Sequence, residues 1–316
     1  MPDQEILPPP EPTAAPNQTP APHTPNTLFR GPHGIRAGWR VLIFWAVVVA
    51  LFIALYLALS MLVRGNVQLD MSQLTPLGLG LTEGTLFVFT SIAALIMARI
   101  EKRQYGQYGL PARFAFRKDF GIGVVVGFLA ISSTLLAISA FHGFHLTGLA
   151  IHGSTIASAA AAWGAAFVVV GLSEEFAFRG YLQFTLTTGM GFWPAAILLS
   201  ALFGLAHKGN PGETTFGLLS VVLFGLLFCI FLRRTGNLWW AVGFHAGWDW
   251  GQTFFYGVSD SGIAPYHNLF GSAFHGPNWL TGGSVGPEAS VFTPTVLVIV
   301  AILFSRVYRE NRYQAA

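Results

Sequence analysis

The sequence has 316 residues, of which 53% are hydrophobic and only 10% are charged, and its net charge is +3 at neutral pH. An ordinary soluble domain carries charge on about a quarter of its residues, so this composition excludes that class and predicts a polytopic membrane protein. The basic residues are spread over loops between apolar runs, which does not indicate a nucleic-acid partner. The single cysteine, Cys229, excludes an intramolecular disulfide.

The first 37 residues differ from the rest of the chain. They hold ten of the 18 prolines, together with Thr, Asn, Gln and Ala, a composition that cannot bury a core. We predict that residues 1–37 are a disordered, cytoplasmic, proline-rich leader. The first apolar run begins only near Trp39 and is long enough to span a bilayer, so no cleavable signal peptide is expected.

The remainder, residues 38–316, is predicted to form one transmembrane bundle. About eight apolar runs follow the leader, each near the roughly 20 residues that cross the hydrocarbon of a bilayer. The fold class is therefore all-α, a polytopic membrane helical bundle with about eight transmembrane helices. The fourth run can continue past Arg179 to about Thr187, which would make that helix long or bent. The runs lie near residues 40–63, 77–98, 120–141, 154–178, 192–207, 214–232, 237–256 and 291–308.

The positions of the basic residues predict the orientation of the chain. With the N-terminus inside, fourteen of the 17 lysines and arginines fall on the inner side, whereas Arg64 and Lys208 fall on the outer side. This asymmetry favours an even number of spans with both termini cytoplasmic. We expect an integral protein of the cell (inner) membrane, with the outer segment near residues 257–290 packed as a cap.

A few ionisable side chains interrupt the predicted spans. Each would cost about 2.5 to 3.5 kcal/mol near the bilayer centre without a partner. Glu175 and Arg179 are four residues apart and can pair on one helix face, whereas Glu174 has no basic residue one turn away. The full set is Glu83, Glu174, Glu175, Arg179, His207, His245 and Asp249.

Three segments of this set lie on three different predicted spans, and their convergence would satisfy them all. Glu174 with one histidine could deprotonate a water while the other histidine and Asp249 stabilise an oxyanion. Alternatively, Glu174, His207 and His245 could hold a divalent metal such as zinc that activates the water. Both interpretations are hydrolytic. Without convergence, the same residues would be a buried ion pair and polar helix contacts, which is also the interpretation for Glu83.

The motifs that carry these residues resemble the CPBP family of intramembrane endopeptidases, the CAAX prenyl protease and bacteriocin-processing group also labelled Abi. The family pattern is Glu-Glu-x-x-x-Arg, Phe-x-x-x-His and His-x-x-x-Asn or Asp. This chain has "EEFAFR", "FGLAH" and "HAGWD" in that order. The resemblance covers roughly residues 150–255, the protease-like core.

The resemblance implies a role for each site residue. Glu174 and His207 would activate water, and His245 with Asp249 would stabilise the oxyanion. Glu175 and Arg179 would support the site. Asp249 stands where the family frequently has Asn, and an ionised Asp cannot donate a hydrogen bond. It would have to be protonated, orient His245 or bind a metal.

We therefore expect an endopeptidase that acts on membrane-presented peptides, with the lipid bilayer as its environment. Straight, full-length spans would place Glu174 and His207 at different depths, so we also expect a bent or oblique element near one of them. Two other functions stay open. One is a non-catalytic scaffold or immunity protein of the same fold, and the other is a proton-coupled transporter that uses Glu174 and His207 as a relay.

Overall fold

The computed structural model describes residues 28–31, 34–62 and 75–315. The chain separates into two units, Met1–Arg36 and Ala37–Ala316. In the first unit, the described part is a short antiparallel pair of β1 (Arg30–Gly31) and β2 (Gly34–Ile35). Most of the predicted leader, residues 1–27 and 32–33, lies outside the described residues, as does Arg64.

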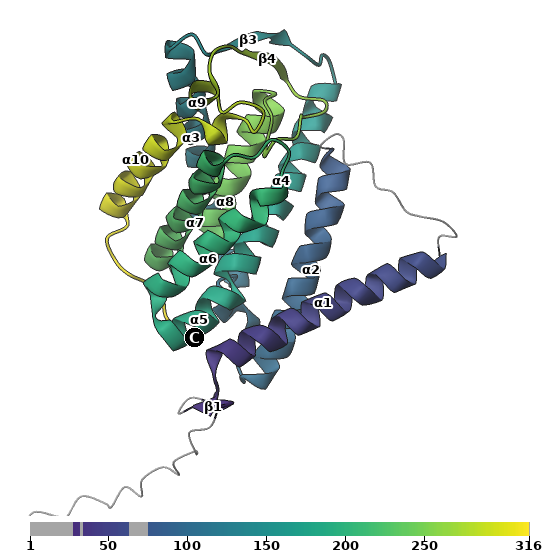
Figure 1. The fold of residues 1–316 in the computed structure, drawn as a ribbon, viewed down its shortest axis with the longest axis vertical. Coiled ribbons are helices and arrows are strands. Elements are labelled where there is room, and N and C mark those ends of the chain that lie inside the picture. Colours follow the sequence, from purple (N-terminus) through teal and green to yellow (C-terminus); the bar gives the residue numbers. More distant parts are fainter. Residues whose placement is uncertain (1–27, 32–33, 63–74, 316) are drawn as a thin grey trace, which may run out of the picture. The chain divides into compact units, whose positions relative to one another are not determined.

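The second unit is a bundle of helices with one small two-stranded sheet (Figure 1), which confirms the predicted all-α, polytopic class. Each predicted apolar run corresponds to a helix, and the ends agree within a few residues when the seventh run is taken as α8 together with the π-helix that follows it. The helices are α1 (Ala37–Leu62), α2 (Pro76–Ile100), α3 (Lys118–Ala140), α4 (Thr155–Arg179), α5 (Tyr181–Met190), α6 (Phe192–Ala206), α7 (Thr215–Thr235), α8 (Trp239–Asp249), α9 (Asn278–Thr281) and α10 (Phe292–Val307).

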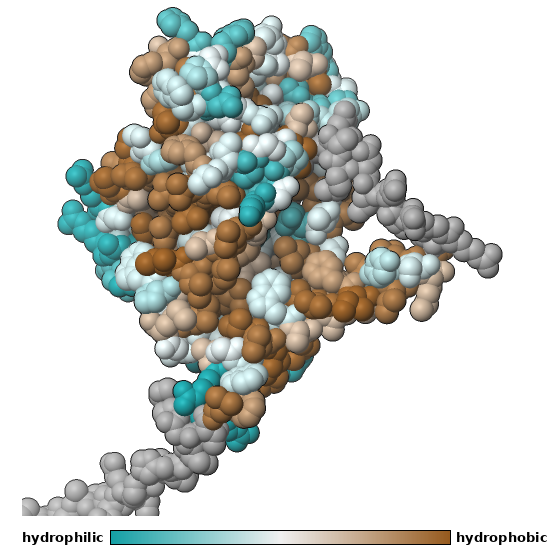
Figure 2. Space-filling model, viewed as in Figure 1, coloured by the Kyte–Doolittle hydropathy of each residue, from teal (hydrophilic) through white to brown (hydrophobic). Residues whose placement is uncertain are grey.

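Among the described residues, five helical runs are long and apolar enough to cross a membrane: α1, α2, α3, α7 and Thr155–Met190, which joins α4 and α5. The apolar helix α10 is shorter. Helix α6 has 15 residues and extends about 22 Å. Figure 2 shows hydrophobic residues over much of the visible flank of the bundle, as a lipid-facing surface requires. The protein is an integral membrane protein.

The fourth apolar run continues past Arg179, but with a break at Gly180. The backbone there leaves the helical region, with φ −80° and ψ −123°, before α5 begins at Tyr181. A Cβ on this residue would lie 2.4 Å from the carbonyl oxygen of Phe176. The bend therefore requires glycine, and it ends α4 directly after the charged motif.

Helices α3 and α8 approach each other through glycines. Gly123 and Gly127 on α3 face Gly243 and Gly247 on α8, so each helix presents two small residues four positions apart. A Cβ at Gly127 would lie 2.1 Å from the carbonyl oxygen of Phe244. A Cβ at Gly247 would likewise lie 2.1 Å from the carbonyl oxygen of Val124. This contact fixes the position of α8, which carries two of the candidate site residues.

The outer segment packs over one end of the bundle, as predicted. It contains β4 (Phe270–Phe274), which pairs antiparallel with β3 (Phe144–Leu149), as well as α9 and the short η5 (Pro287–Ala289). Trp163 of α4 donates its indole N–H to the carbonyl of Tyr266 at 3.1 Å. A π-helix, Trp250–Phe255, continues α8 into this cap. The chain that follows brings Asp260 toward the bundle, where Thr253 donates to it at 2.9 Å.

A buried carboxylate ties the helices together at the opposite end. Glu101, at the end of α2, accepts two hydrogen bonds from Arg40 of α1, at 2.9 and 2.5 Å. It also accepts from the hydroxyls of Tyr108, at 3.0 Å, and Tyr181, at 2.6 Å. Because Tyr181 begins α5, this single side chain joins α1, α2 and α5. Its negative charge is fully compensated by these donors.

The glycine contact predicts a specific sensitivity at Gly127. Gly127→Ala should destabilise the bundle by about 1 to 3 kcal/mol, because the added methyl group meets the backbone of α8 and forces the helices apart. Thermal unfolding in detergent measures this effect. Gly121→Ala on the same helix is the matched control, since a Cβ there meets nothing within 4 Å. Equal melting temperatures for the two variants would contradict the prediction.

Candidate active site

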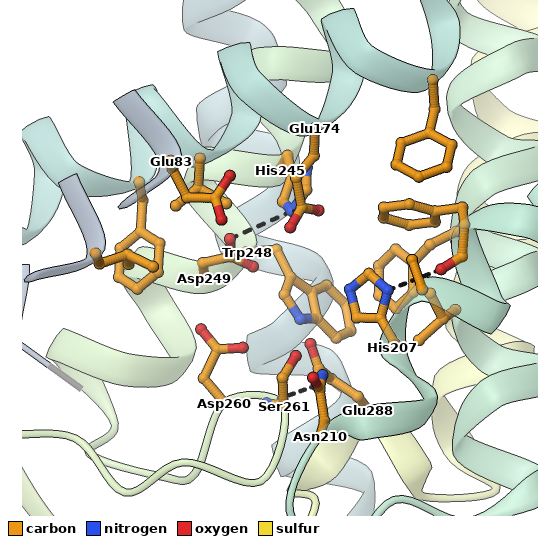
Figure 3. A pocket seen from close by; sticks show the side chains of 18 of the residues that line it. Glu83, Glu174, His207, Asn210, His245, Trp248, Asp249, Asp260, Ser261 and Glu288 are labelled. Carbon is orange, nitrogen blue, oxygen red and sulfur yellow. Dashed lines mark hydrogen bonds and ion pairs between the residues drawn. The ribbon is translucent and has the colours of Figure 1, made fainter. Parts of the chain in front are cut away.

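A cavity of about 340 Å³ lies between α2, α4, α6, α7 and α8, below the cap (Figure 3). Its walls are mostly apolar, and its polar groups converge from several elements. The predicted residues Glu174, His207, His245 and Asp249 all line it. The described polar and charged residues of its lining are Glu83, Glu174, His207, Asn210, His245, Trp248, Asp249, Asp260, Ser261 and Glu288.

The predicted ion pair of α4 is present behind the cavity. Glu175 and Arg179 are both fully buried, with 3.4 Å between Glu175 Oε1 and Arg179 Nη1. The guanidinium also lies over the ring of Phe203, 4.2 Å from its centroid. Helix α7 makes room for it at Gly225, where a Cβ would lie 2.4 Å from Arg179 Nη2. A buried arginine is tolerated here because a carboxylate and aromatic faces compensate its charge.

His245 connects this ion pair to the cavity. Its Nδ1 lies 3.1 Å from Glu175 Oε1, so it donates to that carboxylate. Its Nε2 lies 3.4 Å from Asp249 Oδ2 and 3.7 Å from Glu174 Oε2. The ring stacks on Phe228, with 5.3 Å between centroids. Three acidic neighbours can therefore compensate a proton on each ring nitrogen, which makes Nε2–H a donor toward the cavity.

Glu174 has no partner on its own helix, but the tertiary structure supplies one. Its carboxylate lies beside His245, and its side chain is 20% exposed. In the sequence it directly precedes Glu175, the buried partner of Arg179. Figure 3 shows Glu174 and His245 on one side of the cavity and His207 across from them. Glu174 is thus the accessible member of the acidic doublet.

His207 is held by its own helix end. Its Nδ1 lies 2.8 Å from the carbonyl oxygen of Phe203, one turn earlier in α6. Because a carbonyl only accepts, Nδ1 carries the proton, and a neutral ring then keeps Nε2 free of hydrogen as an acceptor. No ion pair between His207 and a carboxylate occurs among the described residues. His207 and Glu174 both line the cavity, and these two described residues form no ion pair with each other.

The short α6 explains how residues predicted at different depths meet. Helix α5 follows the Gly180 bend, and α6 then runs for only 15 residues before the 3-10 turn His207–Gly209 ends it. His207 therefore stops part-way across the bundle, at the level of Glu174 and His245. The bent or oblique element that the sequence required is the α4–α5–α6 connection.

The structure adds three carboxyl groups that sequence reasoning did not place in the site. The side chain of Glu83, predicted to be a polar helix contact, also lines the cavity. Asp260 and Glu288 come from the cap, and their oxygens lie with that of Asp249 within 4.8 Å of one another. The only signal for Glu83 was a charge inside an apolar span. Asp260 and Glu288 stand in the polar outer segment, where acidic residues are ordinary.

Burial favours the protonated form of a carboxyl group in the cap, that of Glu288. Burial and the nearby Asp260 carboxylate raise the pKa of Glu288 to about 8, although the Ser261 N–H donates to it at 3.1 Å. Glu288 therefore carries a proton through much of the neutral range. Asp249, Asp260 and Glu288 together therefore carry fewer than three negative charges in this range.

The predicted zinc ligands are not gathered into one compact group in this structure, and their role as ligands stays a prediction. The donor atoms of Glu174, His207 and His245 are not gathered within 4.8 Å of one another, whereas those of Asp249, Asp260 and Glu288 are. Zinc sites in enzymes are built largely from histidine and cysteine, so the carboxylate group does not replace the predicted set. The cavity brings together the Glu174 carboxylate, two histidines and a group of acidic side chains.

Residues 156–251 match the family model of type II CAAX prenyl endopeptidase Rce1-like proteins. This Rce1-like segment contains Glu174, His207, His245 and Asp249, together with the supporting pair. The match confirms the family that the three sequence motifs indicated. No curated protein matches the chain.

The supporting ion pair of the Rce1-like segment should be necessary for stability. Arg179→Leu should destabilise the protein by about 3 to 5 kcal/mol, because it leaves Glu175 buried with one cationic partner fewer. Unfolding by a denaturing detergent measures this loss. Arg117→Leu, which removes an exposed arginine, should change stability by less than about 0.5 kcal/mol. Similar losses in the two variants would argue against the pair as a structural support.

Proposed function

We propose that the protein is an intramembrane endopeptidase that hydrolyses peptide bonds of membrane-associated substrates. One observation carries this proposal: Glu174, His207, His245 and Asp249, from three separate segments, line a single cavity in the bundle. The Rce1-like family match over the same residues supports the reaction class. The groups fit water-mediated attack on a carbonyl better than nucleophilic catalysis by the chain itself, since Glu174 is an accessible base.

In the proposed reaction, a water lies between Glu174 and the Nε2 of His207. Glu174 takes one proton while the water oxygen attacks the peptide carbonyl carbon, which becomes tetrahedral and negatively charged at its oxygen. His245 donates from Nε2 to that oxyanion. Collapse of the tetrahedral species breaks the carbon–nitrogen bond, and the proton held by Glu174 passes to the leaving amine. Glu174 is thereby restored as a carboxylate.

Asp249 completes the oxyanion site if it carries a proton. It stands where the family frequently has Asn, and only its neutral form donates a hydrogen bond. The adjacent carboxyl groups of Asp260 and Glu288 support this form, because three close carboxyl groups favour a shared proton over three charges. The protonated aspartate then donates a hydrogen bond to the oxyanion, as the amide of asparagine would. Asp249 also lies 3.4 Å from His245 Nε2, and this contact helps to hold the ring in position.

We also propose that both termini face the cytoplasm in the cell (inner) membrane. The basic residues gather at the end of the bundle where α1 and α3 begin and α2, α7 and α10 end, whereas Lys208 lies toward the cap. The catalytic cavity lies on the side of the cap. The described residues at the basic end are Arg40, Arg99, Lys102, Arg103, Arg113, Arg117, Lys118, Arg233, Arg234, Arg306, Arg309 and Arg312.

Loss of the general base tests the proposed function directly. Glu174→Gln should lower the rate of peptide cleavage by purified protein about 10²- to 10⁴-fold, since the amide cannot accept the proton of water. Glu310→Gln, which alters an exposed carboxylate at the far end of the chain, is the control. Cleavage of a panel of membrane-anchored peptides, prenylated and unprenylated, is followed by mass spectrometry. Wild-type rates in Glu174→Gln would favour a non-catalytic scaffold.

The geometry of the donor atoms also predicts the response to metal removal. Because Glu174, His207 and His245 do not form a compact ligand set, we expect cleavage to persist after metal stripping and in the presence of a chelator. Activity and metal content are measured on the same sample. A rate that falls with chelator and returns with added zinc would instead assign the water activation to a metal.

A further inference from the structure

A second large cleft lies at the basic end of the bundle, away from the catalytic cavity. Its volume is about 880 Å³. One wall is the connection between α2 and α3, which contains the short helices η1 (Tyr105–Tyr108) and η2 (Ala112–Phe114). The others are the turn between α7 and α8 and the last residues of the chain. Its lining includes Arg103, Gln104, Gln107, Arg113, Asp119, Asn237 and Arg312.

The backbone around this cleft is fixed by hydrogen bonds between the three walls. The N–H of Leu238 donates to the carbonyl of Gly109 at 2.8 Å, and the indole of Trp239 donates to that of Pro111 at 3.1 Å. The N–H of Arg312 donates to the carbonyl of Arg233 at 3.1 Å. The cleft is therefore a preformed feature of the fold and needs no ordering of its walls when a ligand binds.

The lining side chains of the cleft carry a net positive charge. Three arginines and one acid, Asp119, are among its described lining residues. Arg113 lies over the ring of Phe114, 4.6 Å from the centroid, and no carboxylate of the described chain is within 4.0 Å of its guanidinium. The Nε and Nη2 of Arg312 donate to Glu310, an exposed carboxylate outside the described lining, at 3.1 and 3.0 Å. Arg103 is 3.9 Å from Glu101, whose oxygens already accept from other groups.

The cleft also lies where lipid headgroups would be. It is bordered by the ends of α2 and α7 and the start of α3, which are three of the predicted membrane-crossing helices. Beside it, Phe114 and Phe116 expose 39% and 58% of their surface. Exposed aromatic rings next to arginines are typical of a segment that lies at the boundary between acyl chains and headgroups.

We infer that this cleft binds the phosphate group of an anionic phospholipid. Guanidinium groups form paired, charge-assisted hydrogen bonds with phosphate oxygens, and the amides of Gln104, Gln107 and Asn237 add neutral donors. Basic pockets at the cytoplasmic ends of transmembrane helices suit such headgroups. A soluble phosphate offers the same chemistry, but the exposed phenylalanines beside the cleft favour a ligand that has acyl chains. The inference concerns a site separate from the catalytic cavity and does not depend on the peptidase activity.

The test uses full-length protein in nanodiscs of phosphatidylcholine with a small fraction of phosphatidylglycerol. Native mass spectrometry after release from the nanodisc counts the phosphatidylglycerol molecules that each protein retains. The double variant Arg113→Gln/Arg312→Gln should retain phosphatidylglycerol about 100-fold more weakly, since each arginine loses a charge-assisted hydrogen bond to the phosphate that contributes about tenfold. Retention of phosphatidylcholine should not change.

A control of equal charge separates the cleft from general attraction to the membrane. Arg117→Gln/Arg309→Gln removes two exposed arginines from the same end but outside the cleft lining. It should retain phosphatidylglycerol within about twofold of wild type, because neither residue reaches the cleft. Equal losses in the two double variants would overturn the site. Size-exclusion profiles and melting temperatures confirm that both variants fold.

A final arm identifies the source of the phosphate. Inorganic phosphate and glycerol phosphate are added at millimolar concentrations to wild-type protein in a neutral detergent, with melting temperature as the readout. Stabilisation by phosphatidylglycerol at far lower concentration, lost in the cleft variant, supports the lipid headgroup. Equal stabilisation by soluble phosphate would overturn the lipid assignment and would identify the ligand of the cleft as a soluble anion.

Discussion

The need to compensate charge inside an apolar bundle controls the arrangement of this protein. Arg179 and Glu175 are fully buried, and neither could be accommodated without the other. Their pair fixes His245 through its Nδ1, and His245 in turn lies beside Glu174 and Asp249. The accessible groups of the cavity are thus oriented by an inaccessible pair behind them. The residues proposed for chemistry and those required for stability form one connected network.

Two local features of the backbone bring His245 and His207 to the same depth in the bundle. Glycines on α3 and α8 let the helices approach until backbone contacts backbone, which sets the height of His245. The bend at Gly180 and the short α6 bring His207 to the same level. Each feature relies on the absence of a side chain. The glycines therefore determine where the two histidines lie.

The two ends of the bundle hold opposite charges for different purposes. At the cap, Asp260 and Glu288 lie beside Asp249, and burial raises the pKa of Glu288 to about 8. At the basic end, Glu101 accepts from Arg40 and two tyrosines and joins three helices, while Arg113 of the adjacent cleft has no ion pair with a described carboxylate. Charge that the protein compensates internally supports the fold. Charge left uncompensated at a surface marks a place for a ligand.

The sequence by itself determined the helical membrane class, the approximate spans and the Glu175–Arg179 pair, because hydrophobic length and the spacing of residues four apart are local properties. It also indicated that Glu174, His207, His245 and Asp249 should converge, since isolated charges in lipid are unfavourable. Only the tertiary structure decided that His245, and not His207, is the neighbour of Glu174. It alone brought Glu83, Asp260 and Glu288 to the cavity, because their contacts join segments far apart in the chain, and no local pattern encodes such distances.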